Sequence, residues 1–181
     1  MSSWLYYWYR RPYLYWPLMP LSWVFASVVC LRRWLYLQGV FKTVSVSCPV
    51  IVVGNLEVSG SGKTPFVIAL VNALKQAGFK PGIVSRGYGR SKHATMEVLA
   101  DSHYADVGDE ALLIHRQSSC PVFVGRSRLN AARSLLQHHD CNVIVCDDGL
   151  QHYALKADLT IALEYVHPEY RNHGLLPVGP Y

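Results

Sequence analysis

Charged residues are scarce in this sequence of 181 residues: they make up 16% of it, whereas hydrophobic residues make up 51%. Acidic residues are the scarcer sign, with 12 Asp and Glu against 17 Lys and Arg, which leaves a net charge of +5. So apolar a composition is not typical of a disordered chain, which lacks the apolar surface for a core. The length is sufficient for one α/β domain with its own core.

Cysteine occurs only five times, and no two cysteines have the C-x-x-C spacing of a zinc or redox motif. The count is odd, and Cys120, Cys141 and Cys146 lie in or beside segments that we expect to be strands. We therefore expect reduced, buried thiols in a cytosolic domain rather than a disulfide framework or a zinc site.

The segment 1–41 contains the longest stretch without charge. The 19 residues from Tyr13 to Leu31 are uncharged, and that length could span a bilayer. Pro17 and Pro20 interrupt a helix, so its uninterrupted part should run from about Leu21 to Leu37. Tryptophan and tyrosine, whose rings prefer the lipid headgroup layer, crowd the start of the segment. These features favour an interfacial or re-entrant anchor over a full span.

Two arginine pairs, Arg10-Arg11 and Arg32-Arg33, flank this aromatic and apolar stretch. The arrangement predicts binding to a membrane surface with anionic lipid, because nucleic acid usually requires a longer basic stripe. Ordinary solvated charges are the alternative. A secretory signal peptide is opposed by the lack of a small-x-small cleavage site at the right place.

An eight-residue segment has the pattern of a phosphate-binding loop between an apolar run at 50–54 and a helical pattern at 63–76. Its residues are Glu57, Val58, Ser59, Gly60, Ser61, Gly62, Lys63 and Thr64. Glycines let backbone N–H groups face phosphate oxygens, and the helix N-terminus adds its positive end. Lys63 would reach the β- and γ-phosphates of ATP, and the Thr64 hydroxyl would bind Mg²⁺. The general pattern begins with Gly where this chain has Glu57, and a Gly-rich turn that binds no nucleotide is the alternative.

Strand-length apolar runs alternate with helical patterns from Pro49 onward. We expect strands at 50–54, 81–85, 121–125, 143–146 and 159–163, and helices at 63–76, from about 107 to 117, and at 127–138. Strands separated by helices indicate a mainly parallel sheet. The predicted fold class is therefore α/β: a P-loop NTPase-like, mainly parallel sheet flanked by helices in residues 42–181, preceded by an N-terminal membrane-associated helix in residues 1–41.

An apolar strand that ends in Asp147-Asp148-Gly149 is the second element of the predicted site. Strands often end in Asp at a turn, so the segment is uninformative alone. Behind a phosphate loop, its carboxylates are expected to reach Mg²⁺ directly or through water. Asp109 and Glu110 begin another predicted helix, where they could also serve only to cap it.

Together these segments resemble the tetraacyldisaccharide 4′-kinase family, which makes the lipid A precursor lipid IV-A. The resemblance covers about residues 45–181, and the N-terminal segment resembles the family's membrane-binding segment. The matching segments are Val53–Leu56, Ser59–Pro65, Ser85–Gly89, Val107–Glu110, Val124–Arg126, Asp147–His152 and Leu175–Pro180. The family tends to have Gly where this chain has Ser59.

The resemblance implies transfer of the ATP γ-phosphate, with Mg²⁺, to the 4′-hydroxyl of a tetraacylated glucosamine disaccharide 1-phosphate. It also implies a peripheral or monotopic protein at the cytoplasmic face of the bacterial inner membrane, which we expect to be a monomer that binds no nucleic acid. The family's catalytic aspartate corresponds to Asp109, which would act together with Lys63. We expect Glu110 to join Thr64, Asp147 and Asp148 at the metal, and Arg86, Tyr88 and His152 to contact the substrate.

In the family the catalytic aspartate pairs with a histidine from a second α/β lobe, which would follow Tyr181. We therefore expect this chain alone to bind Mg-ATP weakly and to transfer essentially no phosphate. Two alternatives remain open: another phosphate-loop enzyme, or a non-catalytic, membrane-bound nucleotide-binding fragment. A GTPase would carry an N/T-K-x-D motif, which is absent from the sequence.

Overall fold

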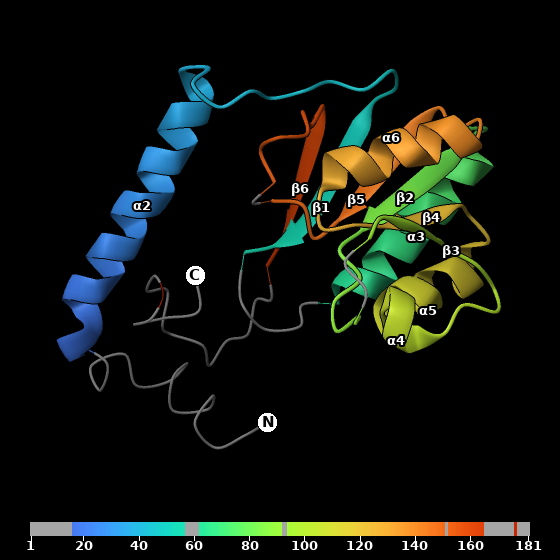
Figure 1. The fold of residues 1–181 in the computed structure, drawn as a ribbon, viewed down its shortest axis with the longest axis horizontal. Helices are drawn as coiled ribbons and strands as arrows, with labels where there is room; N and C mark the ends of the chain where they lie inside the picture. The colour runs from blue at the N-terminus through green and yellow to red at the C-terminus, as the bar shows by residue number, and fades with distance from the viewer. Residues whose placement is uncertain (1–15, 57–61, 92–93, 151, 165–175, 177–181) are drawn as a thin grey trace. The chain divides into compact units, whose positions relative to one another are not determined.

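The computed structural model describes residues 16–56, 62–91, 94–150, 152–164 and 176. The chain divides into two compact units (Figure 1). One unit comprises residues 1–42, 55–61 and 163–181, and the other comprises residues 43–54 and 62–162.

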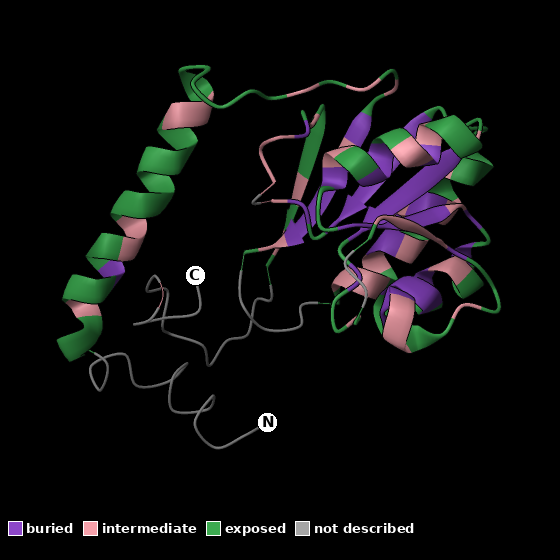
Figure 2. Cartoon of the chain, viewed as in Figure 1, coloured by how far each residue is buried: buried purple, intermediate pink, exposed green. Residues whose placement is uncertain are grey.

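The first unit contains helix α2 (Met19–Leu37), most of whose residues are exposed (Figure 2). Among the described residues, one helical segment, 16–37, is long and apolar enough to cross a membrane, judged by length and composition alone. The helix begins two residues earlier than the expected Leu21. Pro20 falls in its first turn, where the missing N–H would have no intrahelical acceptor, so this proline does not delay the helix.

The second unit is built on a six-stranded sheet. Its strands are β1 (Val50–Asn55), β2 (Pro81–Ser85), β3 (Met96–Val98), β4 (Val122–Val124), β5 (Val143–Asp147) and β6 (Leu159–Leu163). Their order across the sheet is β3-β4-β2-β5-β1-β6. The pairs β1–β5, β5–β2 and β2–β4 are parallel, and β3 is antiparallel to β4. The prediction of a mainly parallel α/β sheet is confirmed.

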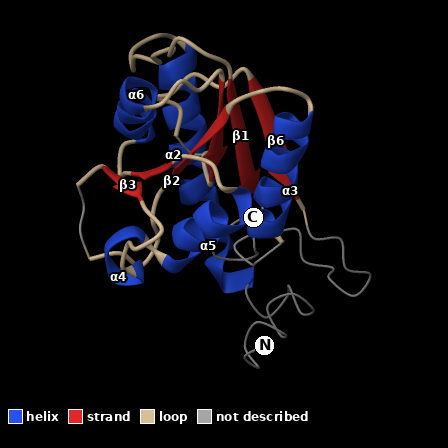
Figure 3. Cartoon of the chain, turned by 90° about the vertical axis from the view of Figure 1, so that its right-hand side faces the viewer, coloured by secondary structure: helices blue, strands red, loops and turns tan. Residues whose placement is uncertain are grey.

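Helices cover both faces of this sheet: α6 (Arg128–His138) lies on one side, and α3 (Lys63–Gln76) lies on the other (Figure 3). The pleat of β5 produces the two cores, because alternate residues of a strand face opposite sides. Ile144 and Cys146 pack in the same cluster as Leu135 of α6. Val145 has the opposite parity and belongs to the α3 face. Helix α5 (Asp109–Ser118) packs beside α3.

Two short elements between β2 and α5 were not expected from the sequence. Strand β3 has three residues, too few for its alternation to be recognised, and it pairs antiparallel at the sheet edge. Helix α4 (Tyr104–Val107) is a single turn whose cap is His103, through Nδ1, which accepts from the backbone N–H of Ala105. Histidine is not among the residues that usually signal a helix start.

Candidate active site

Parallel strands β2, β4 and β5 end at the same edge of the sheet. The registers pair Ser85 with Val124 and Val84 with Cys146, so Val124, Ser85 and Asp147 lie along one line at the carboxyl ends. This edge is where open α/β sheets bind ligands, because the loops there are free to vary while the strands hold them in place.

Asp147 is buried at this edge, with 1% of its surface exposed. Its Oδ2 accepts a hydrogen bond from the Ser85 hydroxyl at 3.1 Å. Its Oδ1 is also buried and has no hydrogen-bond partner within the part of the chain that the structure describes. Burial raises the pKa of Asp147, and the nearby charge of Lys63 only partly opposes this effect. A buried carboxylate oxygen without a hydrogen-bond partner lowers the stability of the folded state unless a bound ligand or metal interacts with it.

The turn that follows Asp147 is packed directly against β1. The backbone N–H of Gly149 donates to the carbonyl of Val53 at 3.3 Å. A Cβ at Gly149 would lie 2.9 Å from Cγ1 of Val52, which only glycine avoids. Asp148 lies between these anchored residues with a left-handed φ of 58°. The acidic turn is therefore held by the core and not by solvent-exposed loop contacts.

Lys63 and Asp148 form an ion pair across the edge, with 2.8 Å between Nζ and Oδ1. The lysine side chain is 16% exposed and the aspartate 52%. Burial raises the pKa of Asp148, but the hydrogen bond and charge of Lys63, with Arg128 and Arg86, outweigh it and hold this pKa below its ordinary value. Lys63 can take this position because α3 begins directly after Gly62, whose φ is 72°.

Thr64 follows Lys63 in the first turn of α3 and is half-buried. The remaining residues predicted for the phosphate loop lie outside the described residues: Glu57, Val58, Ser59, Gly60 and Ser61. Their role in binding phosphate stays a prediction.

The start of α5 brings a further carboxylate toward the acidic turn. The pKa of Glu110 is raised by burial and by the negative charge of Asp147, while Lys63 opposes the shift. Asp109 is exposed, and its Oδ1 accepts from the backbone N–H of Glu110 at 2.9 Å. Asp109 is the first residue of the helix, and the cap is Gly108, which has no side chain to donate or accept. Asp109 is therefore not the N-cap residue, but its carboxylate lies in the first turn and accepts one of the N–H groups of the helix start.

Two glycines explain how the turn after β2 meets α5. A Cβ at Gly108, whose φ is 90°, would lie 2.8 Å from the carbonyl oxygen of Tyr88. A Cβ at Gly87 would lie 2.7 Å from the carbonyl oxygen of Val107. The two backbones thus pack face to face, which places the Arg86–Arg90 turn directly against the helix that carries Asp109.

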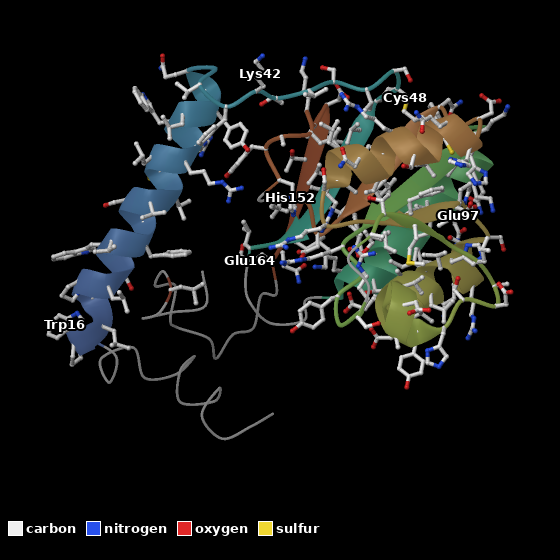
Figure 4. The ribbon with its side chains drawn as sticks, in the orientation of Figure 1. Trp16, Lys42, Cys48, Glu97, His152 and Glu164 are labelled. Carbon is white, nitrogen blue, oxygen red and sulfur yellow. The ribbon has the colours of Figure 1, made fainter. Side chains whose placement is uncertain are left out.

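A cavity of about 540 Å³ opens beside Asp109. Its other lining residues are Asp101, Ser102, His103, Tyr104, Leu112, Leu113 and Arg116. Of the residues predicted to contact substrate, Arg86 is exposed, and its charge helps to lower the pKa of Asp148. Tyr88 is 76% exposed. His152, labelled in Figure 4, lies half-buried in the loop after β5, where its backbone N–H donates to Gly149. None of the three lines the cavity.

Sequence reasoning missed two residues of this edge, Ser85 and Arg128. Ser85 ends a strand just before the Arg86 turn, so its position at the carboxyl edge could have been noticed. Arg128 begins α6, where an arginine would ordinarily be expected to face solvent. Its burial depends on the tertiary packing of α6 against β4, which no local pattern reveals.

The donor set fits Mg²⁺. Among the described residues, no three His, Cys, Asp or Glu side chains gather closely enough to hold a metal by themselves. Mg²⁺ differs from zinc in commonly taking one or two carboxylates and completing its octahedron with water and substrate phosphates. The buried Oδ1 of Asp147, the carboxylate of Asp148 and the Thr64 hydroxyl are hard oxygen donors of this kind.

Comparisons with known proteins find one family. A family model described as tetraacyldisaccharide-1-P 4′-kinase (LpxK) matches residues 14–181. The tetraacyldisaccharide 4′-kinase of Nitrosococcus oceani is 46% identical over 175 residues, which are 96% of this chain and 52% of that protein. The one from Thiobacillus denitrificans is 49% identical over 164 residues, which are 90% of this chain and 50% of that protein.

A solved structure is also similar. The crystal structure of the "apo" form of LpxK from Aquifex aeolicus, in complex with ATP, matches with a TM-score of 0.82 and 32% identity. The match covers 92% of this chain and 53% of that chain. The chain therefore spans about half the length of the curated relatives it matches.

Proposed function

Because the chain belongs to the tetraacyldisaccharide-1-P 4′-kinase family, we propose that it is the nucleotide-binding half of a lipid-sugar kinase that uses ATP and Mg²⁺. The reaction of the whole protein would transfer the γ-phosphate to the 4′-hydroxyl of a tetraacylated glucosamine disaccharide 1-phosphate and yield lipid IV-A. The observation that carries the proposal is the pair Lys63–Asp148 beside the buried Asp147, at the start of a helix that follows a glycine-rich segment.

Lys63 would bind the β- and γ-phosphates. Its ammonium pairs with Asp148 at 2.8 Å, which places it at the edge where phosphates would enter. Backbone N–H groups of residues 57–62 would surround the phosphate oxygens. With phosphate in place of the Asp148 carboxylate, Lys63 would still be paired, and Asp148 would be available to the metal.

Thr64, Asp147 and Asp148 would hold the metal. Glu110, whose pKa is affected by the charges of Asp147, Lys63 and Asp148, would lie close enough to join them. Bound Mg²⁺ would neutralise charge on the transferred phosphoryl group. Ser85 donates to Oδ2 of Asp147, so the buried Oδ1, which has no hydrogen-bond partner among the described residues, would be the oxygen available to the metal.

Asp109 would accept the proton of the attacking hydroxyl. Its Oδ1 is engaged with the N–H of Glu110, and the carboxylate is exposed beside the cavity of about 540 Å³. An exposed carboxylate next to an open cavity is suited to remove a proton as the oxygen–phosphorus bond forms. The cavity gives the acceptor sugar room to approach it.

The helix α2 would anchor the protein at the cytoplasmic face of the inner membrane, as a peripheral or monotopic protein. Its exposed tryptophans, Trp23 and Trp34, and the pair Arg32-Arg33 suit an interface with anionic lipid. Deletion of residues 1–41 should release the protein from liposomes that contain anionic lipid, measured by co-sedimentation. Equal binding by the deleted protein would place the anchor elsewhere.

The test of the function uses the full-length protein, γ-labelled ATP and the tetraacylated disaccharide acceptor. We expect Mg²⁺-dependent appearance of label in the lipid, with no label when ATP is labelled only at the α position. Absence of transfer by a folded, ATP-binding, full-length protein would contradict the proposed reaction.

A second candidate function for this chain alone is nucleotide binding without phosphate transfer. It is favoured because the chain covers about half of the length of each relative. Nucleotide binding and lipid phosphorylation should be measured separately on the 181-residue chain. We expect weak binding of Mg-ATP and essentially no transfer. Rapid transfer by this chain alone would show that it contains all of the catalytic groups.

A further inference from the structure

Among the described residues, Arg128 is a large charged side chain that is almost completely buried, with 2% of its surface exposed. It lies directly behind the acidic turn that follows β5. Its Nη1 donates to the carbonyl of Gly125 at 3.2 Å, and its Nη2 donates to the carbonyls of Asp148 at 3.0 Å and of Asp147 at 3.4 Å. One guanidinium therefore joins the end of β4 to the end of β5.

These acceptors are the backbone groups of the two residues expected to hold Mg²⁺. Asp148 has a φ of 58°, a conformation that an L-residue with a side chain adopts only when its surroundings hold it. The hydrogen bond to its carbonyl supplies such a hold. A planar guanidinium with donors at fixed angles can engage several carbonyls at once, which a lysine ammonium on a flexible stem does less well.

The charge of Arg128 acts in the same place. Burial lowers the pKa of the guanidinium, and the carboxylates of Asp148 and Asp147 oppose that effect. The same guanidinium helps to hold the pKa of Asp148 below its ordinary value. Lys63 and Arg86 are the other cations that act on the pKa of Asp148. On our account Lys63 turns to phosphate when ATP binds, and Arg86 is exposed to solvent. Arg128 is then the buried cation that stays behind the two carboxylates.

Burial of this arginine is not explained by fold stability alone. Removing a guanidinium from water is energetically unfavourable. Its Nε has no hydrogen-bond partner within the described part of the chain, so the cost is not fully offset by hydrogen bonds. An apolar side chain would fill the same space between α6 and β5 without that cost.

We infer that Arg128 is a positioning residue for the Mg²⁺ side of the nucleotide site, where it holds the backbone of Asp147 and Asp148 so that their carboxylates face the ligand. The inference rests on the proposed function. It assigns no contact between Arg128 and ATP, metal or acceptor. Its consequence is specific: loss of Arg128 should weaken the response to Mg²⁺ more than it weakens nucleotide binding.

The experiment compares the full-length wild type with Arg128→Met, Arg128→Lys and the control Arg133→Met, which removes an exposed arginine from the same helix. Binding of a fluorescent ATP analogue is titrated with and without Mg²⁺, and the Mg²⁺ concentration for half-maximal binding is measured. Residues behind metal ligands typically contribute 10–100-fold to metal affinity. We therefore expect Arg128→Met to require about 10-fold or more Mg²⁺, and to bind nucleotide without Mg²⁺ within about twofold of wild type.

Arg128→Lys keeps the charge and most of the volume, so it should lie between Arg128→Met and wild type. Arg133→Met should match wild type. A folded Arg128→Met with wild-type Mg²⁺ dependence, or with equal losses in both conditions, would overturn the inference. If Arg128→Met does not fold, Arg128→Lys decides: a shifted Mg²⁺ requirement supports the inference, and an unshifted or unfolded protein overturns it. A wild type that does not bind the analogue would instead overturn the proposed function.

Discussion

The acidic turn after β5 and the start of α5 each present carboxylates to the same edge of the sheet, but they are held in opposite ways. Asp147 is buried and accepts a hydrogen bond from the Ser85 hydroxyl. The turn that follows it is fixed by two hydrogen bonds: the Gly149 N–H donates to the carbonyl of Val53, and the Arg128 guanidinium donates to the carbonyl of Asp148. Asp109 is exposed, and its Oδ1 accepts from the N–H of the next residue in the chain.

On the proposed function, this difference would separate two tasks of a phosphoryl-transfer site. Metal ligands gain from rigidity, because Mg²⁺ demands near-ideal octahedral geometry. A general base must meet an acceptor that arrives from outside, so it gains from exposure beside an open cavity. On this account the core of the domain positions the metal side, and glycine contacts at a surface turn position the reaction side.

Asp109→Asn, on the exposed side of this comparison, should have the largest effect on catalysis. In the full-length enzyme we expect kcat to fall by about 10²–10⁴-fold, because the amide cannot accept the proton. ATP affinity and the unfolding temperature should barely change, since Asn can still accept from the N–H of Glu110. Asp140→Asn removes an exposed carboxylate elsewhere and serves as control. A variant that retains almost full kcat would remove Asp109 from the chemistry.

Lys63→Ala should follow, with turnover reduced roughly 10²–10³-fold or more through loss of the charge that stabilises the transferred phosphoryl group. The matched control is Lys80→Ala, because Lys80 also pairs with an aspartate, Asp140, at 2.6 Å but on an exposed surface. Both variants lose a lysine–aspartate pair, and only the first should lose activity, measured as initial rates at saturating acceptor. Near-normal turnover by Lys63→Ala would contradict the assignment of the phosphate-binding lysine.

Gly108→Ala tests the packing that positions Asp109, and its effect should be smaller. The residue has a φ of 90° and its Cβ would meet the carbonyl of Tyr88 at 2.8 Å. Gly78→Ala is matched to it, because its φ is 86° but nothing lies within 4 Å of its Cβ. The backbone conformation should cost about 1 kcal/mol or more in both variants, and the clash should add a further ~1–2 kcal/mol only at Gly108.

The free energy of unfolding from denaturant titrations measures both glycine variants. Equal losses would mean that the turn after β2 does not press on the start of α5. A larger loss at Gly78 than at Gly108 would contradict the packing outright.

The regular elements could be predicted because their signals are local. Helix α3 begins and ends at the residues expected from its apolar face and from Gly78 beyond its end, and β2 matches its expected range of 81–85. Residues Lys63, Asp147 and Asp148 could be brought together in advance, because a glycine-rich loop and an acidic strand end meet at the same edge of a parallel sheet. The ion pair of Lys63 with Asp148 agrees with that expectation.

What could not be predicted depends on contacts between distant segments. Nothing near Arg128 in the sequence distinguishes it from a solvated helix residue, and its burial arises from the way α6 crosses the end of β4. Asp109 does not occupy the N-cap position expected for a capping residue, because that position is taken by Gly108, a glycine with positive φ packed against the Tyr88 turn. Its carboxylate accepts an N–H in the first turn instead. Both features are tertiary.

The central claim is that the buried carboxylate of Asp147 costs stability by itself and contributes to binding Mg-ATP. Thermal unfolding of the wild type and Asp147→Asn, with and without Mg-ATP at neutral pH, tests it. Burial raises the pKa of Asp147, so the folded state binds the proton of this carboxyl more tightly than the unfolded state does. The free energy of unfolding therefore falls as the pH rises and Asp147 ionises. The ligand-free variant should therefore unfold at the same temperature as wild type or higher. Mg-ATP at 100 times its Kd should stabilise the wild type by about 2.7 kcal/mol and leave the variant nearly unchanged. Equal stabilisation of both proteins by Mg-ATP would contradict the account.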